Sequence, residues 1–123
     1  MKIINLTQHL ATPSQTANGV VDLDPEARSI VGGLLTFSHE DAIYVNMIRR
    51  ARQIASYAMG YRSAMIGGAP AFMSFLEKAL EDIRVKPLYS FSERKSVEKI
   101  MPDGTVQKTA VFEHVGWWEL SKS

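Results

Sequence analysis

Short apolar runs alternate with amphipathic segments along most of the chain, and this pattern predicts strands separated by helices. Apolar residues recur at helical spacing in residues 41–59 and 70–83, and shorter helices are expected after Pro13 and Pro25. The strand-like apolar runs between them cover residues 3–6, 20–23, 63–66 and 87–91. Strands that alternate with helices favour right-handed crossovers and a parallel sheet.

Capping and helix-breaking residues set the expected ends of these helices. Ser38 is expected to cap the longest helix, over residues 41–59, and Gly60 is expected to end it. The helix that follows Pro25 is expected to cover residues 26–31 and to break at the glycine pair of residues 32–33.

The C-terminal third has the pattern of a hairpin. Asp103 and Gly104 separate alternating runs over residues 96–100 and 105–112, which predicts two antiparallel strands joined by a tight turn. The fold class expected is therefore α/β: a small three-layer Rossmann-like fold with a mostly parallel sheet and a C-terminal antiparallel hairpin. The alternative is an α+β domain with a mixed sheet, because the strand-like run at residues 20–23 is short.

Composition narrows the class of protein. The 123 residues suit a single domain over residues 1–123, with 46% hydrophobic and 22% charged residues. Fourteen basic and 13 acidic residues give a net charge of +1, which argues against binding of long nucleic acid. The chain has no cysteine, which excludes disulfides and zinc–thiolate sites. No signal-peptide pattern and no apolar run of about 20 residues is present, so we expect a soluble cytoplasmic protein without a membrane partner.

Polar residues follow three of the expected strands. Ligands of open parallel sheets bind beyond the carboxyl ends of the strands, where residues 5–9, 67–70 and 90–96 are expected to meet. The candidate ligand-binding residues are Asn5, Thr7, Gln8, Gly67, Gly68, Ala69, Ser90, Lys95 and Ser96, and the candidate catalytic residues are His9, Ser92 and Arg94.

The most informative stretch is the glycine pair Gly67 and Gly68, which ends an apolar run just before Pro70 opens a helix. Glycines let a ligand approach the backbone closely, and free N–H groups at a helix start attract an anion. The simpler alternative is a tight turn from strand to helix. The stretch lacks the Gly-Lys-Ser/Thr ending of a phosphate P-loop and the third glycine of a dinucleotide fingerprint.

For each of the other candidate residues, the sequence allows a role in ligand binding or catalysis and also a simpler structural role. Arg94 can grip a phosphate with its planar guanidinium, Lys95 offers a point charge, and Ser92 offers a hydroxyl. The alternative for these three is a solvated loop before the hairpin. His9 can exchange a proton near neutral pH or donate a hydrogen bond, and the alternative is a loop histidine that caps backbone groups.

The remaining histidines and the tryptophan pair indicate structure rather than chemistry. His39 is expected to cap a helix start, and His114 is expected to be structural or to lie at a subunit interface. No metal site and no cofactor are expected, because the histidines lack ligand spacing. Trp117 and Trp118 are adjacent in a strand, so their rings point to opposite faces, and an exposed ring there favours a homodimer contact.

The order of the segments IINLTQH, AMIGGAP, PLYSFSERKSVE and AVFEHVGWWEL resembles small Rossmann-like proteins carried by CRISPR loci and mobile elements, of ring-nuclease type. Such proteins sense or cleave cyclic oligoadenylate second messengers in antiviral defence. The resemblance implies a homodimer with the ligand over the dimer axis, and metal-independent attack of a ribose 2′-hydroxyl on the adjacent phosphate. It would give His9 a part in proton transfer, Arg94 a part in phosphate neutralisation, and Gly67 and Gly68 a cradle for the phosphate.

The leading hypothesis is a protein that binds a nucleotide-like anionic ligand at the carboxyl ends of the parallel strands. Whether it also cleaves the ligand, as a metal-independent phosphodiesterase, stays open. The alternative is a non-catalytic partner-binding or inhibitory protein of phage or plasmid origin. A small enzyme that acts on a nucleoside or sugar phosphate is the third possibility.

Overall fold

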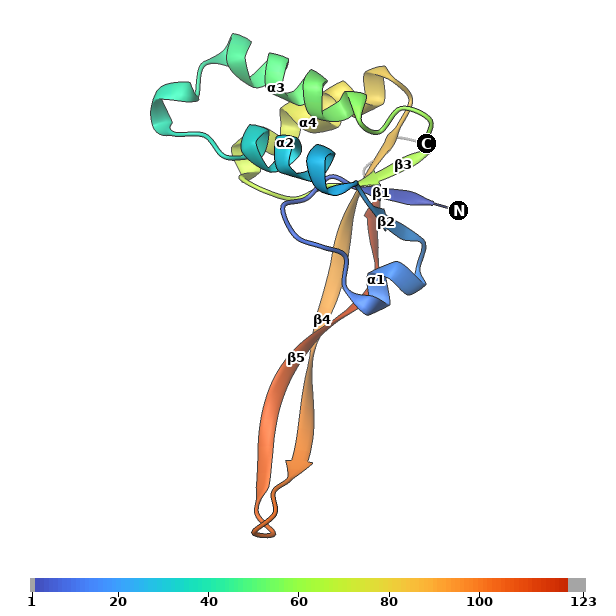
Figure 1. Cartoon of the computed structure of the whole chain (residues 1–123), viewed down its shortest axis with the longest axis vertical. Helices are drawn as coiled ribbons and strands as arrows, with labels where there is room; N and C mark the ends of the chain where they lie inside the picture. Colours follow the sequence, from blue (N-terminus) through green and yellow to red (C-terminus); the bar gives the residue numbers. More distant parts are fainter. Residues whose placement is uncertain (1, 120–123) are drawn as a thin grey trace.

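The computed structural model describes residues 2–119; the side chains of Arg94, Lys95, Val97, residues 109–112 and Glu119 lie outside the described part. Strands and helices alternate through most of it (Figure 1). In chain order the elements are β1 (Ile3–Asn5), α1 (Pro13–Ala17), β2 (Val20–Asp22), α2 (Pro25–Leu35), a 3-10 turn (His39–Asp41), α3 (Tyr44–Ser56), β3 (Ser63–Met65), α4 (Pro70–Asp82), β4 (Lys86–Ile100) and β5 (Val106–Glu119).

The strands form one five-stranded sheet in the order β2-β1-β3-β4-β5. The first four strands are parallel, and Ile4 of β1 aligns with Val21 of β2 and Ala64 of β3. Only β5 runs antiparallel, beside β4. The α/β prediction, with a mostly parallel sheet and a C-terminal antiparallel pair, is confirmed. After β1 the chain forms β2 on one side of β1, and it then forms β3 on the opposite side of β1. The strand order therefore reverses between β1 and β3.

The helices cover the sheet in two unequal layers (Figure 1). Helices α2, α3 and α4 lie on one face above the main core, in which Ile4, Leu6, Ile54, Phe72 and Leu76 are almost fully buried. Helix α1 lies on the other face, where a small cluster contains Ile3, Val20, Met65 and Leu88. The three layers follow from burial of apolar surface on both faces of the parallel strands.

Helix α2 does not break at its glycine pair. The helix continues through Gly32 and Gly33 to Leu35, so the prediction of a break there is wrong. A glycine costs about 1 kcal/mol in a helix interior. Val31 before the pair is 1% exposed, and Leu35 after it packs against the main core. Burial of these side chains outweighs the glycine cost.

The longest predicted helix is two elements. Ser38 begins the 3-10 turn, where its backbone N and its Oγ donate to Asp41 Oδ2 at 3.1 and 3.2 Å. Helix α3 starts only at Tyr44 and ends at Ser56, short of the predicted 41–59. Asn46 Nδ2 donates to the carbonyl of Asp41 at 2.7 Å and joins the turn to the helix. The Ser38 cap therefore starts a separate turn rather than α3.

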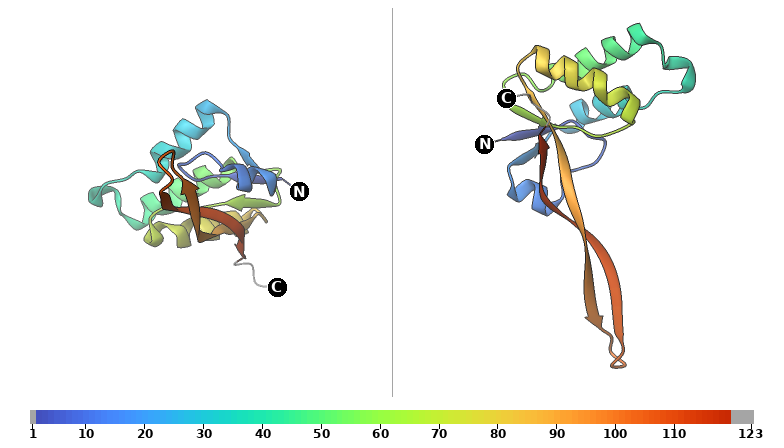
Figure 2. Two further views of the ribbon diagram at one scale, coloured as in Figure 1. Left: turned by 90° about the horizontal axis from the view of Figure 1, so that it is seen from below. Right: turned by 180° about the vertical axis from the view of Figure 1, so that it is seen from behind.

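Strands β4 and β5 form a long two-stranded ribbon that projects from the body (Figures 1 and 2). Residues 92–95, which lie between the expected strand at 87–91 and the expected hairpin strand at 96–100, join the two into one strand, β4, that runs without interruption to Ile100. The two strands turn at Gly104, whose φ is +86°, and Asp103 Oδ1 accepts a hydrogen bond from the Thr105 N–H at 3.0 Å. Both faces of a projecting ribbon are exposed to solvent. The polar residues 92–96 can therefore form a strand without the alternation of apolar and polar residues that a strand with one buried face shows.

In residues 2–119, no helix combines the length and the apolar character that crossing a membrane requires.

Candidate functional site

A pocket of about 520 Å³ lies where β1 and β3 end, beside Tyr89 and Ser90 of β4, at the point where the strand order reverses. Pockets of small-molecule ligands are of this size, and open α/β sheets bind ligands at this place. The lining residues come from the segments that follow β1 and β3 and from β4: Thr7, Gln8, His9, Leu10, Thr12, Gln15, Met65, Ile66, Gly67, Gly68, Tyr89 and Ser90. Two of the three segments predicted to meet here therefore do so, and the third contributes Ser90.

Asn5 holds the loop between β1 and α1 in shape. Its side chain is 3% exposed, and Nδ2 donates to the His9 carbonyl at 2.7 Å and to Asp22 Oδ1 at 2.8 Å. Its Oδ1 accepts from the Thr7 N–H at 2.9 Å and from Thr7 Oγ1 at 2.7 Å. These four bonds use the full capacity of an amide. The prediction that Asn5 contacts the ligand is therefore corrected: Asn5 positions the loop whose residues line the pocket.

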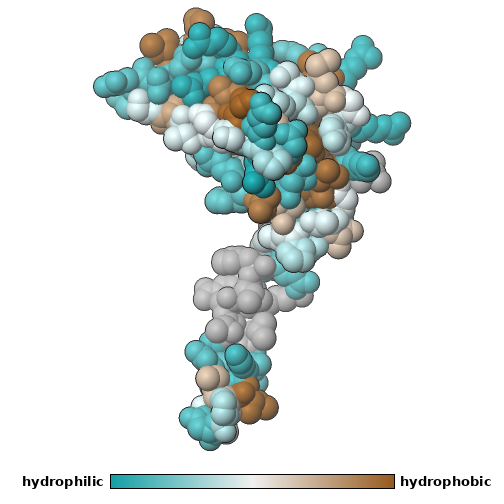
Figure 3. Space-filling view, viewed as in Figure 1, coloured by the Kyte–Doolittle hydropathy of each residue, from teal (hydrophilic) through white to brown (hydrophobic). Residues whose placement is uncertain are grey.

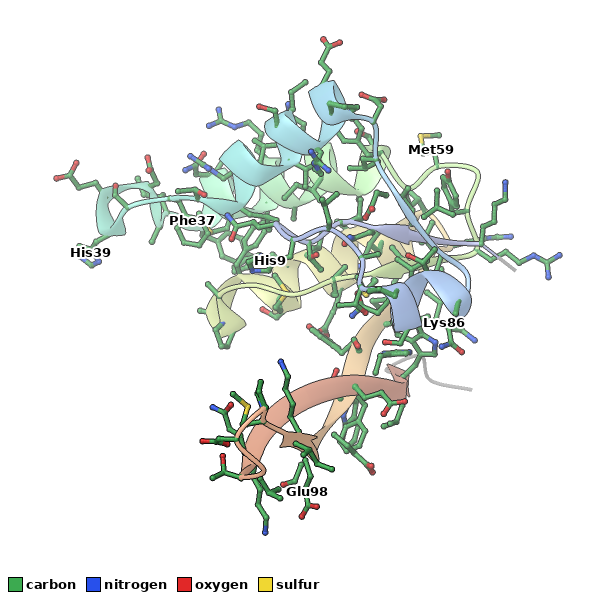
Figure 4. All side chains as sticks on the ribbon, turned by 60° about the horizontal axis from the view of Figure 1, so that its bottom comes forward. His9, Phe37, His39, Met59, Lys86 and Glu98 are labelled. Carbon is green, nitrogen blue, oxygen red and sulfur yellow. The ribbon has the colours of Figure 1, made fainter. Side chains whose placement is uncertain are left out.

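The loop residues after Asn5 reach the pocket. Gln8 Nε2 donates to Thr36 Oγ1 at 2.8 Å and to the Gly32 carbonyl at 3.3 Å, which ties the loop to the end of α2. His9 is exposed on this loop, and no residue of the described chain hydrogen-bonds to its ring (Figure 4). Thr7, Gln8 and His9 all line the pocket, as predicted.

The glycine turn forms a second wall. Gly68 is exposed and has a φ of +152°, a backbone conformation that residues other than glycine rarely adopt. A Cβ at Gly68 would lie 3.2 Å from Met73 Cε, and a Cβ at Gly67 would lie 3.6 Å from Thr7 Cγ2. The positive φ favours glycine at position 68, whereas the Met73 Cε contact is with the end of a flexible side chain that can shift by a few tenths of an ångström.

The amino end of α4 is the one helix start near the pocket without a side-chain cap. Thr12 caps α1 by accepting from Gln15 N, and Asp24 caps α2 by accepting from Ala27 N. Ala69, at the N-cap of α4, has no side-chain acceptor. Pro70 has no N–H, and the Phe72 N–H donates to the Ala69 carbonyl at 3.0 Å, so the Ala71 N–H is the donor of the first turn that is left for another partner. Ala69 itself is exposed but is not among the residues that line the pocket.

Ser90 connects the pocket to a buried histidine. Ser90 Oγ lies 2.6 Å from His114 Nδ1 and accepts a hydrogen bond from Gln15 Nε2 at 3.1 Å. The His114 ring is 7% exposed and its centroid lies 4.4 Å from a ring centroid of Trp117. Burial lowers the pKa of His114, so its imidazole is neutral at pH 7.

Sequence reasoning missed the parts that Gln15 and His114 play here. Residues 90 and 114 meet because β5 pairs with β4 around a bulge between Phe91 and Ser92. The available clues were the position of His114 in an apolar strand-like run and Gly116, an isolated strand glycine that pairs with Phe91 at the bulge.

Tyr89 fixes the wall beside Ser90. Its hydroxyl donates to Glu77 Oε2 of α4 at 2.6 Å. Burial and this hydrogen bond raise the pKa of Tyr89, so the phenol remains protonated throughout the neutral range. The contact joins the pocket-lining part of β4 to α4.

The remaining candidates lie along the ribbon. Ser92 and Ser96 are exposed in β4 and do not line the pocket. The side chains of Arg94 and Lys95 lie outside the described residues, although the backbone pairs Arg94 with Phe112 in the ribbon. The prediction that residues 92–96 converge with the glycine turn is wrong, because β4 does not end at Ser90.

A second hollow of about 530 Å³ lies between α3 and α4, away from the strand ends. It contains Arg52 and Lys78, and Lys78 Nζ is paired with Asp82 Oδ1 at 2.7 Å. No sequence candidate lies there. Among the described residues, no group of three or more histidine, aspartate or glutamate side chains is placed to hold a metal ion.

The two tryptophans lie in different environments, as predicted. Trp117 packs against the small core cluster beside α1. Trp118 is 58% exposed and meets Phe91 edge to face, with 5.6 Å between ring centroids. A contact of Trp118 with a second copy of the chain stays a prediction.

Comparison with known proteins gives one match. The model of the uncharacterized protein MJ1673 family matches residues 1–118, which include every segment that lines the pocket and both strands of the ribbon. No curated protein and no solved structure matches the chain. Because the match covers nearly the whole sequence, the chain belongs to the uncharacterized protein MJ1673 family.

Proposed function

We propose that the pocket binds a nucleotide-like anionic ligand. One observation carries this proposal: the Gly67–Gly68 turn and the start of α4, which has no side-chain cap, lie next to the pocket where the strand order reverses. Helix amino ends in this position of α/β sheets favour phosphate groups through open N–H donors and the helix dipole.

The chemistry of the lining supports an anion over a cation. None of the lining residues is an aspartate or glutamate, so no carboxylate repels a phosphate there. Among the lining side chains, the exposed His9 ring has an N–H in either tautomer, whereas the Thr7 hydroxyl already donates to Asn5 Oδ1 at 2.7 Å. None of the lining residues is a lysine or arginine either, so backbone donors carry most of the recognition in this proposal.

A cyclic oligoadenylate is the ligand that the sequence resemblance favours, with metal-independent phosphodiester cleavage in the cytoplasm as part of the proposal. Arg94 and Ser92 belong to the ribbon, so the proposal assigns phosphate contacts to the α4 amino end and to His9. Thermal shift against a nucleotide panel that includes cyclic oligoadenylates, followed by chromatography of each mixture, tests binding and cleavage separately. Binding raises the apparent stability by mass action.

Substitution of Gly68 by alanine is expected to weaken binding of the nucleotide that gives the largest shift at least tenfold. The φ of +152° is strained for alanine, and the new Cβ would lie 3.2 Å from Met73 Cε, so we expect the backbone of the turn to change conformation. Calorimetric titration measures the affinity. Gly60→Ala is the matched control, because Gly60 also has a positive φ, +92°, but lies outside the pocket. Equal affinity of the Gly68→Ala variant and the wild type would contradict the proposal.

A second candidate function is binding of another protein chain through the ribbon. Ile100 and Val106, paired near its tip, are 76% and 56% exposed, and Figure 3 shows hydrophobic side chains there among hydrophilic ones. Two-stranded ribbons are marginally stable alone in water. We propose a second copy of the chain as the partner, in keeping with the exposed Trp118 near the base of the ribbon.

Shortening the ribbon is expected to convert a dimer into a monomer. Residues 97–109 are replaced by Asn-Gly, which joins the paired positions Ser96 and Ala110 with a tight turn. Size-exclusion chromatography with light scattering measures the mass of both proteins. Because the pocket lies at the other end of β4, nucleotide binding should persist in the shortened protein. A monomeric wild type at micromolar concentration would refute this candidate.

A further inference from the structure

Ser90 has an unusual hydrogen-bond arrangement for a strand serine at a pocket. A serine hydroxyl has one hydrogen and two lone pairs. Gln15 Nε2 carries only donors, so it occupies one lone pair of Ser90 Oγ at 3.1 Å. In the histidine tautomer with its proton on Nε2, His114 Nδ1 accepts the Ser90 hydrogen at 2.6 Å. The other lone pair of Ser90 Oγ remains for an electrophile.

His114 is held in a state suited to a base. Its Nε2 is buried without a hydrogen-bond partner, which is a rare and costly condition for a polar atom. The Trp117 ring on one side and the surrounding core exclude water. Burial lowers the pKa of His114, so the free base is present at neutral pH.

We propose that Ser90 is a nucleophile activated by His114, and that the group it attacks is a phosphoester of the ligand. This inference rests on the proposed function for the identity of the substrate. Ser90 belongs to the pocket wall, and Gly67 and Gly68 line the same pocket, where backbone N–H groups of the glycine turn stabilise charge on the phosphoryl oxygens. Gln15 orients Ser90 as a positioning residue.

The reaction balances with water as the only co-reactant. Ser90 Oγ forms a bond to phosphorus while its proton moves to His114 Nδ1. The bond from phosphorus to the leaving oxygen breaks, and that oxygen takes the proton from His114. Water then attacks the phosphoserine with His114 as the base, which releases the phosphate product and restores Ser90.

Covalent labelling with a fluorophosphonate tests the pair without any nucleotide. Attack by Ser90 forms an O–P bond, breaks the P–F bond and releases fluoride, with the serine proton taken up by His114. Peptide mass spectrometry is expected to place the adduct on Ser90 in the wild type and to find none there in Ser90→Ala. Labelling of Ser90 in His114→Asn should be about 100-fold slower, the low end of general-base effects. Asn keeps an acceptor near the Nδ1 position but is not a base.

The controls separate chemistry from folding. Ser56→Ala changes an exposed serine on α3, and its labelling rate should equal that of the wild type. Near-ultraviolet circular dichroism reports whether His114→Asn is folded. If the folded wild type gives no Ser90 adduct, or if folded His114→Asn is labelled at the wild-type rate, the inference is wrong. Nucleotide binding without labelling would overturn the Ser90–His114 pair alone, whereas labelling without nucleotide binding would overturn the proposed function and the phosphoester substrate.

Discussion

Replacement of Asn5 by aspartate is expected to lower the free energy of unfolding by about 3 kcal/mol, the scale for a buried charge left without a partner. The two side chains have nearly the same volume, so packing is unchanged. Asn5 Nδ2 donates to the His9 carbonyl and to Asp22 Oδ1, and a carboxylate oxygen there would face two acceptors. Urea unfolding followed by circular dichroism measures the change.

The same substitution should abolish nucleotide binding, because the loop that Asn5 holds supplies four consecutive lining residues, from Thr7 to Leu10. Asn18→Asp is the matched control. Asn18 is exposed, and within residues 2–119 its side chain makes a hydrogen bond from Nδ2 to the Ser14 carbonyl at 2.7 Å, so we expect a loss of about 1 kcal/mol at most. Equal losses in the two variants would show that Asn5 does not organise the pocket.

Replacement of Phe72 by alanine is expected to lower the free energy of unfolding by about 3–5 kcal/mol, as for other large aromatic side chains removed from a core. Phe72 is 1% exposed in the first turn of α4. Its ring meets Phe37 edge to face with 5.6 Å between centroids, and Figure 4 shows where Phe37 lies. Because Phe72 anchors the end of α4 that borders the pocket, nucleotide affinity should fall with stability.

Two further variants separate cavity formation from loss of an aromatic ring. Phe72→Leu keeps most of the volume and should cost less than about 1.5 kcal/mol. Phe91 is 41% exposed on the ribbon, so Phe91→Ala should cost about 1 kcal/mol or less. Thermal or urea unfolding of the three proteins gives the order. A Phe72→Ala variant as stable as Phe91→Ala would contradict the assignment of Phe72 to the core.

The class of fold was predictable because apolar runs and helical spacing alternate so regularly. A buried parallel strand has no polar face, and Ile3 and Ile4 are both nearly fully buried, as that rule requires. The glycine turn and the loop after β1 were predictable for a related reason: parallel strands bring their carboxyl ends to one edge, so Thr7 and Gly68 line one pocket.

The ribbon was not predictable from the same rules. The dense polar run after Ser90 has the composition of a loop, and nothing in its spacing distinguishes a loop from a strand with solvent on both faces. This error misplaced Ser92 and Ser96 and hid the partner of Ser90. The meeting of Ser90 with His114 depends on a bulge at Phe91, which only the pairing of two distant segments defines.

The part of Asn5 was hidden for another reason. A polar residue at the end of a buried strand is typical of a ligand contact, and the sequence predicts one. Whether the Asn5 amide has a hydrogen-bond donor left for a ligand depends on the positions of the Asp22 carboxylate and the His9 carbonyl. Those positions are set only in the folded loop.

Chemical-shift mapping of the backbone amides during titration with the nucleotide that gives the largest thermal shift tests the central claim most directly. We expect the largest perturbations at Thr7, Gln8, Gly67 and Gly68, with smaller ones in the first turn of α4. Absence of perturbation at these amides, or a response confined to the hollow that contains Arg52 and Lys78, would contradict the assignment of the pocket as the ligand site.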